Sequence, residues 1–317
     1  MKKLLITRPM PDSVLARAQA GFDTTVRQSN RPLQGAELRQ SLRNFDVVMP
    51  TLGDVYDHDV FADIGAPRCQ LLANFGVGYN HIDVDAATAA GIMVTNTPGA
   101  VTEATADIAL MLMLMSARRA GEGERMVRAG TWEGWHPTQM MGLHLSGKAV
   151  GVVGMGRIGQ AIAHRCHFGF GMRVKYYNRS IKQIGFDAKR YESLNELASN
   201  VDFLVAAVPG GAATHHIINA GVFAALPSHA RFINISRGDV VDEVALIEAL
   251  KNGVIEGAGL DVYENEPKVP AELIKMENVV LLPHLGTAAL EIRTQMGLMA
   301  VENLEAFDRS LPLPNRI

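Results

Sequence analysis

Cysteine is scarce in this sequence, and its scarcity limits where the protein works. Among 317 residues only Cys69 and Cys166 are cysteines, and they do not form a Cys-x-x-Cys pair. Two such thiols exclude a disulfide framework. Sparse, unpaired cysteine is typical of a reducing compartment, so we expect a cytoplasmic protein.

An excess of charge of one sign is also missing. The formal net charge is −3, and no stretch is rich in lysine and arginine. Nucleic acids and anionic membrane surfaces select basic patches. We therefore expect neither of them as a partner.

Long apolar runs are absent as well. Residues 108–115 are wholly apolar, but a membrane-spanning helix needs about 20 such residues. At the N-terminus, two lysines are followed by only three apolar residues, which is too short for the core of a signal peptide. The sequence therefore predicts a soluble protein without a membrane span.

The sequence does contain short apolar runs that alternate with helical patterns almost throughout. Such alternation predicts parallel sheets that are covered by helices on both faces. The runs fall into two sets, each of which we expect to form its own sheet. The first set is 3–7, 46–49, 71–74 and 92–95, and the second is 149–153, 174–177, 203–207, 232–235, 257–261 and 279–282.

Two further helical patterns suggest the domain boundaries in a chain long enough for two domains. One begins at Thr102, between the two sets, and is apolar on too many sides for a single buried stripe. We expect it to pack against two bodies. The other, 289–308, follows the last expected strand and could return to the first domain. The predicted domains are therefore 1–100 with 286–317, and 101–285.

A glycine-rich turn in mid-chain predicts a dinucleotide site. Gly154, Gly156 and Gly159 join an expected strand to an expected helix in the sequence GMGRIG. There the first glycine permits a tight turn, the second lets a pyrophosphate approach the backbone, and the third lets helix and strand pack closely. The helix N-terminus adds free N–H groups for the phosphates, next to Arg157 and Ile158. The alternative is a glycine-rich turn without a ligand.

The end of the following strand bears on the choice of coenzyme. NAD-specific sites carry Asp or Glu here, which binds the ribose 2′-hydroxyl. This sequence has Asn178, Arg179 and Ser180 instead, with Lys182 close behind. Arg179 offers a permanent planar charge that matches phosphate oxygens, and Ser180 adds a hydroxyl donor. The sequence therefore favours NADP(H), with NAD(H) possible; the alternative is an ordinary polar turn.

Charged side chains follow three successive expected strands. Arg237 follows the first, Asp261 and Glu266 follow the second, and His284 follows the third. The carboxyl ends of parallel strands share one edge of the sheet, where α/β proteins build their sites. We expect an arginine, a carboxylate and a histidine to converge there on one cleft.

Several longer segments form a specific combination. They are FGVGYNHID at 75–83, TNTPG at 95–99, TEATAD at 102–107, the glycine turn, ISRG at 235–238, ENEP at 264–267 and LPH at 282–284. Together these segments resemble the D-2-hydroxyacid dehydrogenase family over about residues 71–287. Within it, NRS at 178–180 and WEGWHP at 132–137 are most similar to the glyoxylate/hydroxypyruvate reductases. The resemblance implies two doubly wound parallel-sheet α/β domains, a flavodoxin-like substrate domain and a Rossmann-type dinucleotide-binding domain, with a cleft between them.

The resemblance also implies catalytic roles that the side-chain chemistry permits. Arg237 would bind the substrate carboxylate through charge-assisted hydrogen bonds. His284 would donate a proton to the substrate oxygen as hydride arrives from NADPH, or remove it in the reverse direction. Glu266 would hydrogen-bond the imidazole and fix its tautomer. Glu264 is a competing partner for His284, but Glu266 matches the family's Glu-Pro position.

Further contacts are implied by the same resemblance. The N–H groups of Val77 and Gly78 would bind the substrate carboxylate, and Leu52 would limit substrate size. Trp135 would reach across a homodimer interface into the neighbouring site, the alternative being a tryptophan that covers a core. The resemblance implies that the coenzyme is lined by the glycine turn and by residues 178–180. The other residues implied to line it are Thr105, Val208, Pro209, Ile235, Asp261 and Gly286.

The implied reaction is the reduction of glyoxylate or hydroxypyruvate to glycolate or D-glycerate. Two alternatives stay open: a broader reductase of 2-oxo acids such as 2-ketogluconate or phenylpyruvate, and a dinucleotide-sensing corepressor on the same scaffold. We expect no metal. His164 and His167 share a helix face, but such pairs are more often solvated or structural, and we interpret His215 and His216 as loop residues.

Overall fold

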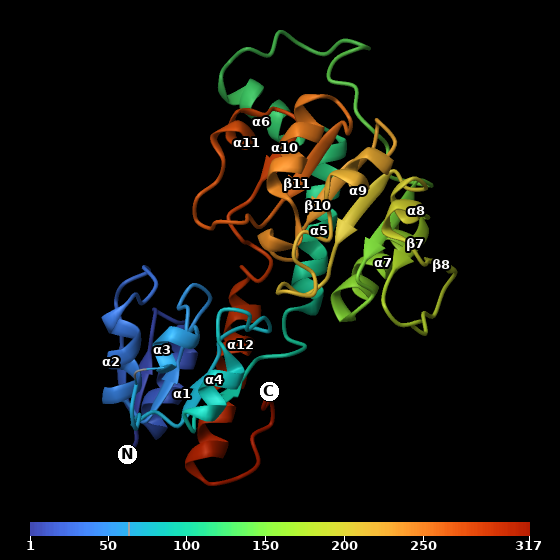
Figure 1. The fold of residues 1–317 in the computed structure, drawn as a ribbon. Coiled ribbons are helices and arrows are strands. Elements are labelled where there is room, and N and C mark those ends of the chain that lie inside the picture. The colour runs from blue at the N-terminus through green and yellow to red at the C-terminus, as the bar shows by residue number, and fades with distance from the viewer. Residues whose placement is uncertain (63) are drawn as a thin grey trace. The chain divides into compact units, whose positions relative to one another are not determined.

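The computed structural model describes residues 1–62 and 64–317 of the chain (Figure 1). The chain forms two compact units. Unit 1 consists of Met1–Val101 and Ala288–Ile317, and unit 2 of Thr102–Thr287. These limits lie one and two residues from the boundaries that the sequence suggests. The C-terminal segment thus folds with the N-terminal one.

Unit 1 is built on a parallel sheet with helices on both faces. Its strand order is β2-β1-β3-β4-β5, with β1 at Lys3–Ile6, β2 at Asp23–Val26, β3 at Val47–Met49, β4 at Leu71–Ala73 and β5 at Met93–Thr95. Its helices are α1 (Asp12–Gly21), α2 (Ala36–Asn44), α3 (His58–Ala62), α4 (Val84–Ala89) and α12 (Leu290–Asp308).

Alternation along β1 explains why both faces of this sheet are covered. Successive side chains of a strand point to opposite faces. Leu4 and Ile6 lie in one core together with Val14 of α1 and Val301 of α12. Leu5 lies in the other core, on the side of α2 and α3. The C-terminal helix therefore completes a core that the N-terminal segment begins.

Unit 2 has a larger parallel sheet of the same kind. Its strand order is β12-β11-β10-β9-β6-β7-β8, with β6 at Ala149–Val153, β7 at Arg173–Tyr177, β8 at Ala188–Tyr191, β9 at Phe203–Ala206, β10 at Arg231–Asn234, β11 at Gly257–Leu260 and β12 at Val279–Leu281. Its helices are α5 (Thr102–Ala117), α6 (Ala120–Arg128), α7 (Arg157–Phe170), α8 (Leu194–Ala198), α9 (Ala220–Ala225), the 3-10 helix η1 (Gly238–Val240), α10 (Glu243–Lys251) and α11 (Ala271–Lys275).

Helix α5 shows why its sequence is apolar on several sides. It contacts strands β10, β11 and β12 as well as helix α7. Its approach to the sheet is close, because a Cβ at Gly259 of β11 would lie 3.0 Å from the Cβ of Leu112. The sheet and α7 are thus two bodies that cover this helix within unit 2.

The sequence prediction missed two strands, β2 and β8, which both lie at a sheet edge. Their sequences, DTTV and AKRY, are mostly exposed or half-buried. An edge strand pairs on one side only and needs no continuous apolar run. Among the described helices, none is long and apolar enough to cross a membrane.

Candidate active site

The glycine turn joins β6 to the N-terminus of α7, and its three glycines meet different demands. Gly154 has a φ of +97°, which glycine adopts without strain. A Cβ at Gly159 would lie 2.0 Å from the carbonyl oxygen of Gly154, so only glycine lets α7 approach the turn this closely. A Cβ at Gly156 would meet nothing within 4 Å. The protein's own packing does not require Gly156, which fits a backbone left open to a pyrophosphate.

The residues after β7 are tied to this turn by a carboxamide. Asn178 Oδ1 accepts a hydrogen bond from the Met155 N–H at 3.1 Å, and its Nδ2 donates to the Ser180 carbonyl oxygen at 2.7 Å. Arg179 and Ser180 are exposed, and residues 178–182 contain no carboxylate. This segment therefore offers an arginine beside the glycine turn and no negative charge that would repel a 2′-phosphate.

A histidine and a glutamate meet at the carboxyl end of the unit 2 sheet. His284 Nδ1 lies 2.9 Å from Glu266 Oε2, and Glu266 Oε1 accepts the Tyr263 N–H at 3.1 Å. Burial by itself would raise the pKa of Glu266. The hydrogen bond and charge of His284, together with the Tyr263 N–H, outweigh burial and hold that pKa below its usual value. Glu266 is thus an ionised acceptor for the imidazole.

Arg237 follows β10 at the same edge of the sheet. Its Nη1 donates to the Ser236 carbonyl oxygen at 2.8 Å, whereas its buried Nε has no hydrogen-bond partner among the described residues. Burial lowers the pKa of Arg237, while the charges of Glu266 and Asp239 oppose that shift. A guanidinium stays charged in proteins, so this site holds a cation with an unused donor.

Asp261, which follows β11, fixes the backbone that carries His284. Its Oδ1 accepts the Leu285 N–H at 2.6 Å, its Oδ2 accepts the Gly286 N–H at 2.8 Å, and its carbonyl oxygen accepts the His284 N–H at 2.9 Å. Burial raises the pKa of Asp261, although the two amide bonds oppose the shift. Because His284 has a φ of +56°, which is uncommon for a residue other than glycine, these bonds hold it in an unusual conformation.

A second set of sequence-predicted residues lies in unit 1, in the loop between β4 and α4. Asn96 Nδ2 donates to the Val77 carbonyl oxygen at 2.9 Å, and Asn74 Nδ2 donates to that of Gly78 at 3.0 Å. In the described part of the chain, no hydrogen bond occupies the N–H groups of Val77 and Gly78. The half-buried Leu52, after β3, accepts a bond from Arg8 Nη1 at 2.6 Å through its carbonyl oxygen. The loop therefore presents two free amide donors.

Known proteins are similar to this chain in both sequence and fold. A family model described as "D-isomer specific 2-hydroxyacid dehydrogenase, NAD binding domain" matches residues 110–286. The glyoxylate reductase of Pyrococcus furiosus is 42% identical over 316 residues, which cover 97% of this chain and 92% of that protein. The chain belongs to the D-isomer-specific 2-hydroxyacid dehydrogenase family. It is an NAD(P)-dependent oxidoreductase of 2-hydroxy acids.

Two further relatives of this dehydrogenase are a glycerate dehydrogenase and a reductase solved with bound ligands. The glycerate dehydrogenase of Hyphomicrobium methylovorum is 35% identical over 309 residues, or 96% of this chain and 95% of that protein. A solved NADPH-dependent glyoxylate/hydroxypyruvate reductase of Sinorhizobium meliloti, in complex with NADP and malonate, superimposes with a TM-score of 0.86 at 37% identity. The superposition covers 100% of this chain and 96% of the chain of that reductase. These likenesses confirm the predicted fold class.

The remaining residues predicted to line the coenzyme fall into two groups in the dehydrogenase. Thr105 Oγ1 donates to the Gly286 carbonyl oxygen at 3.2 Å, beside Asp261. Val208 accepts a hydrogen bond from the Ser236 hydroxyl, next to Ile235. Pro209 accepts one from Thr214 at 2.6 Å. All of these residues are in unit 2.

Each of the two glutamates considered as a partner for His284 contacts a different histidine in the structure. Glu264 Oε1 lies 2.7 Å from His216 Nε2, whereas Glu266 bonds His284. His215, interpreted from the sequence as a loop residue only, lies in a group of possible metal ligands with His216 and Glu264.

The other histidine pair, His164 and His167, packs against phenylalanine rings. The His167 ring stacks on Phe186 with centroids 4.8 Å apart, and the His164 ring contacts Phe168 at 4.6 Å. Cys166 between them is buried, and burial raises the pKa of its thiol to about 12. Among the described residues these two histidines belong to no group of three possible metal ligands.

Trp135 lies in the segment between α6 and β6 and does not cover a core of its own chain. Its exposed fraction is 79%, and that of Trp132 is 53%. The alternative of a core-covering tryptophan therefore does not fit this structure.

Two residues that follow Arg237, Gly238 and Asp239, were not among the site residues predicted from the sequence. A Cβ at Gly238 would lie 1.9 Å from the carbonyl carbon of Tyr263, so glycine is needed where η1 meets the loop that leads to Glu266. Asp239 Oδ2 accepts the Gly211 N–H at 3.0 Å and so anchors the loop after β9. The ISRG segment contains a signal for the glycine, but no local pattern indicates the contact of Asp239.

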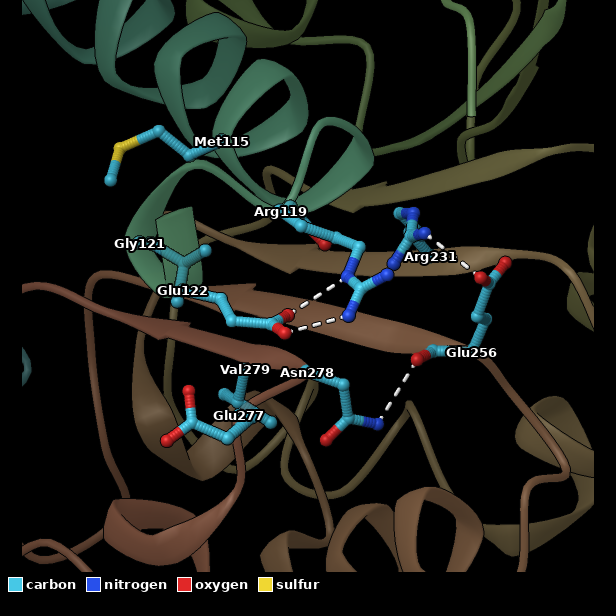
Figure 2. A pocket seen from close by; sticks show the side chains of 11 residues that line it. Met115, Arg119, Gly121, Glu122, Arg231, Glu256, Glu277, Asn278 and Val279 are labelled. Atoms are coloured by element: carbon cyan, nitrogen blue, oxygen red, sulfur yellow. Dashed lines mark hydrogen bonds and ion pairs between the residues drawn. The ribbon is translucent and has the colours of Figure 1, made fainter. Parts of the chain in front are cut away.

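A separate cavity of about 260 Å³ lies at the amino ends of strands in the unit 2 sheet, away from the carboxyl ends that carry Arg237 and Asp261 (Figure 2). Arg231, at the start of β10, and Val279, at the start of β12, help to line it. Arg231 is only 2% exposed, and its Nη2 lies 3.2 Å from Glu256 Oε1. Because α/β sheets bind their ligands at the carboxyl ends of strands, this cavity is not the dehydrogenase site.

Proposed function

We propose that the protein reduces glyoxylate and hydroxypyruvate with NADPH, which yields glycolate and D-glycerate. The observation that carries this proposal is the ionised Glu266 bonded to His284, with the buried cation of Arg237 at the same sheet edge. The names of the glyoxylate and hydroxypyruvate reductases among the relatives support the substrate class.

The proposed coenzyme fits the residues present. The open backbone at Gly156 and the N-terminus of α7 offer amide donors to a pyrophosphate, and Arg179 offers its charge to a 2′-phosphate. The remaining predicted lining residues would contact the nicotinamide half. Bound NADPH supplies the hydride that reaches the 2-keto carbon.

The chain's own residues would bind the keto acid and supply its proton. Arg237 would pair with the substrate carboxylate. In unit 1, the free N–H groups of Val77 and Gly78 are donors of the kind that a carboxylate accepts. Since Nδ1 of His284 faces Glu266, its Nε2 is the ring nitrogen that delivers the proton to the 2-keto oxygen. Glu266 holds the ring and stabilises its charged form until the proton leaves. One hydride and one proton thus convert the keto acid to the hydroxy acid.

Initial rates test this proposal and its alternatives together. We expect glyoxylate and hydroxypyruvate to be reduced with a higher kcat/KM than pyruvate, phenylpyruvate or 2-ketogluconate, and with NADPH preferred to NADH. Equal or better rates with 2-ketogluconate or phenylpyruvate would favour the broader reductase. An absence of turnover with every 2-oxo acid would favour the corepressor and end the proposal.

The coenzyme preference is tested by Arg179→Ala. A hydrogen bond to a charged group contributes about 1.5–3 kcal/mol, so we expect KM for NADPH to rise about tenfold or more, with little change for NADH. Arg173→Ala is the matched control, because Arg173 is an exposed arginine at the opposite end of the same strand. An unchanged NADPH/NADH ratio in Arg179→Ala would remove the 2′-phosphate from the assignment.

The proposed assembly is a homodimer in the cytoplasm, with Trp135 contributed to the neighbouring site. The 79% exposure of Trp135 supports a partner that covers it. We expect light scattering to give the mass of a dimer, and Trp135→Ala to raise KM for hydroxypyruvate about tenfold, as the loss of a buried aromatic contact can do. Trp132→Ala is the control from the same loop. A monomer with full activity would contradict the assembly.

A further inference from the structure

Two consecutive histidines and a glutamate bring their ligand atoms together in unit 2. His215 and His216 lie in the loop between β9 and α9, and Glu264 lies in the loop after β11. One ligand atom from each lies within 4.8 Å of the other two. The His216–Glu264 distance is 2.7 Å, and the two imidazole rings stack with their centroids 3.9 Å apart. The group is separate from His284, whose partner is Glu266.

The backbone around this group is held by specific contacts. Neighbouring side chains of an extended chain point in opposite directions, but His216 has a φ of +49° and its ring stacks on that of His215. The His216 N–H donates to the Asp239 carbonyl oxygen at 2.8 Å. On the other side, the Glu264 N–H donates to Glu243 Oε2 at 3.4 Å. The two loops therefore present these side chains to each other before any ligand arrives.

We propose that His215, His216 and Glu264 form a binding site for a divalent transition metal, with Zn²⁺ as the reference ion. Two imidazole nitrogens and one carboxylate oxygen are a donor set that Zn²⁺ favours, and three protein ligands leave a fourth position for water. With metal–ligand bonds of about 2.0–2.1 Å, tetrahedral ligand atoms lie about 3.3 Å apart. The His216–Glu264 contact must open slightly, and the exposed His215 must turn inward.

Metal binding would add a crosslink to contacts that already exist. The site connects the loop that Asp239 anchors to the loop that leads from Glu264 to Glu266. When the metal binds, the hydrogen bond between His216 and Glu264 is lost, and coordination of both side chains to one ion replaces it. The competing explanation is that this hydrogen bond only ties the two loops together. That explanation requires no contribution from His215 and predicts no metal binding.

Zinc titration of the metal-free full-length protein separates these explanations. We expect wild type to bind one Zn²⁺ in competition with a chromophoric chelator. His215→Ala and Glu264→Gln should each weaken that binding about tenfold or more. Glu264→Gln keeps an oxygen that accepts from His216. His215→Ala removes an exposed ring together with its stacking on His216, so zinc affinity rather than stability is the primary readout. Zn²⁺ should also raise the Tm of wild type more than that of either variant.

The control is His229→Ala. His229 is a half-exposed histidine bonded to a carboxylate, Asp202 at 2.7 Å, but among the described residues it belongs to no group of three possible metal ligands. Zinc affinity should stay at the wild-type value in this variant. Failure of wild type to bind Zn²⁺, or equal affinity in wild type, His215→Ala and Glu264→Gln, would overturn the proposal. The readout is metal binding, so it stands or falls independently of the proposed reductase activity.

Discussion

His284→Ala should lower kcat for glyoxylate reduction by about a hundredfold or more, which is the usual contribution of a general acid. In the proposed mechanism the imidazole delivers the proton, and its removal leaves water as the donor. The Kd for NADPH should change little, because the coenzyme's phosphates are assigned to the glycine turn. Steady-state rates and a fluorescence titration of NADPH measure the two quantities.

His229→Ala is again the matched control, since it removes a half-exposed histidine that also contacts a carboxylate. Its kcat should equal that of wild type. If His284→Ala also retained a near-normal kcat, His284 would have no place in the mechanism.

Glu266→Gln examines the same pair through the pH dependence of stability. The pKa of Glu266 is lower in the folded protein than its usual value. The ionised carboxylate therefore adds stability above the unfolded pKa of about 4.3, and this contribution is lost as the pH falls through the folded value. Urea unfolding at about pH 6 and about pH 3 should show a smaller loss of stability in Glu266→Gln than in wild type. An identical loss would mean that the pair does not stabilise the fold.

Gly156→Val should abolish high-affinity coenzyme binding without unfolding the protein. A Cβ at Gly156 meets nothing within 4 Å, and its φ of −77° suits any residue. The Tm should therefore stay close to that of wild type. The added side chain occupies the space where a pyrophosphate would approach the backbone. We expect the Kd for NADPH to rise on the order of a hundredfold, or about 2.8 kcal/mol.

Gly159→Ala is the informative comparison, because it should fail in a different way. Its Cβ would lie 2.0 Å from the Gly154 carbonyl oxygen, so α7 must move away from the turn. Overpacking of this kind costs about 1–3 kcal/mol, and the Tm should fall. Equal Tm values for both variants, with NADPH binding retained in Gly156→Val, would show that the open backbone at Gly156 is not the phosphate site.

The sequence predicted the buried strands well because their residues must be apolar on both faces. β6, for example, has the predicted bounds of 149–153, and all of its residues are buried. The edge strands β2 and β8 escaped prediction, because solvent on one side permits the polar sequences DTTV and AKRY.

Only those parts of the candidate site that have local sequence signals could be predicted. Glycines with fixed offsets, and charged residues directly after buried strands, are local signals. The division of Glu264 and Glu266 between His216 and His284 is not local, since it depends on which loops meet. The same holds for the anchoring of the His284 backbone by Asp261.

The sequence by itself determined that this chain forms two parallel-sheet α/β bodies, carries a dinucleotide turn and places arginine, carboxylate and histidine after successive strands. These properties follow from the order of apolar runs, glycines and charges along the chain. Only the tertiary structure decided which glutamate bonds which histidine, and that His215 joins a second group. Hydrogen bonds and ligand distances depend on how separate loops are brought together, and chain order does not specify those distances.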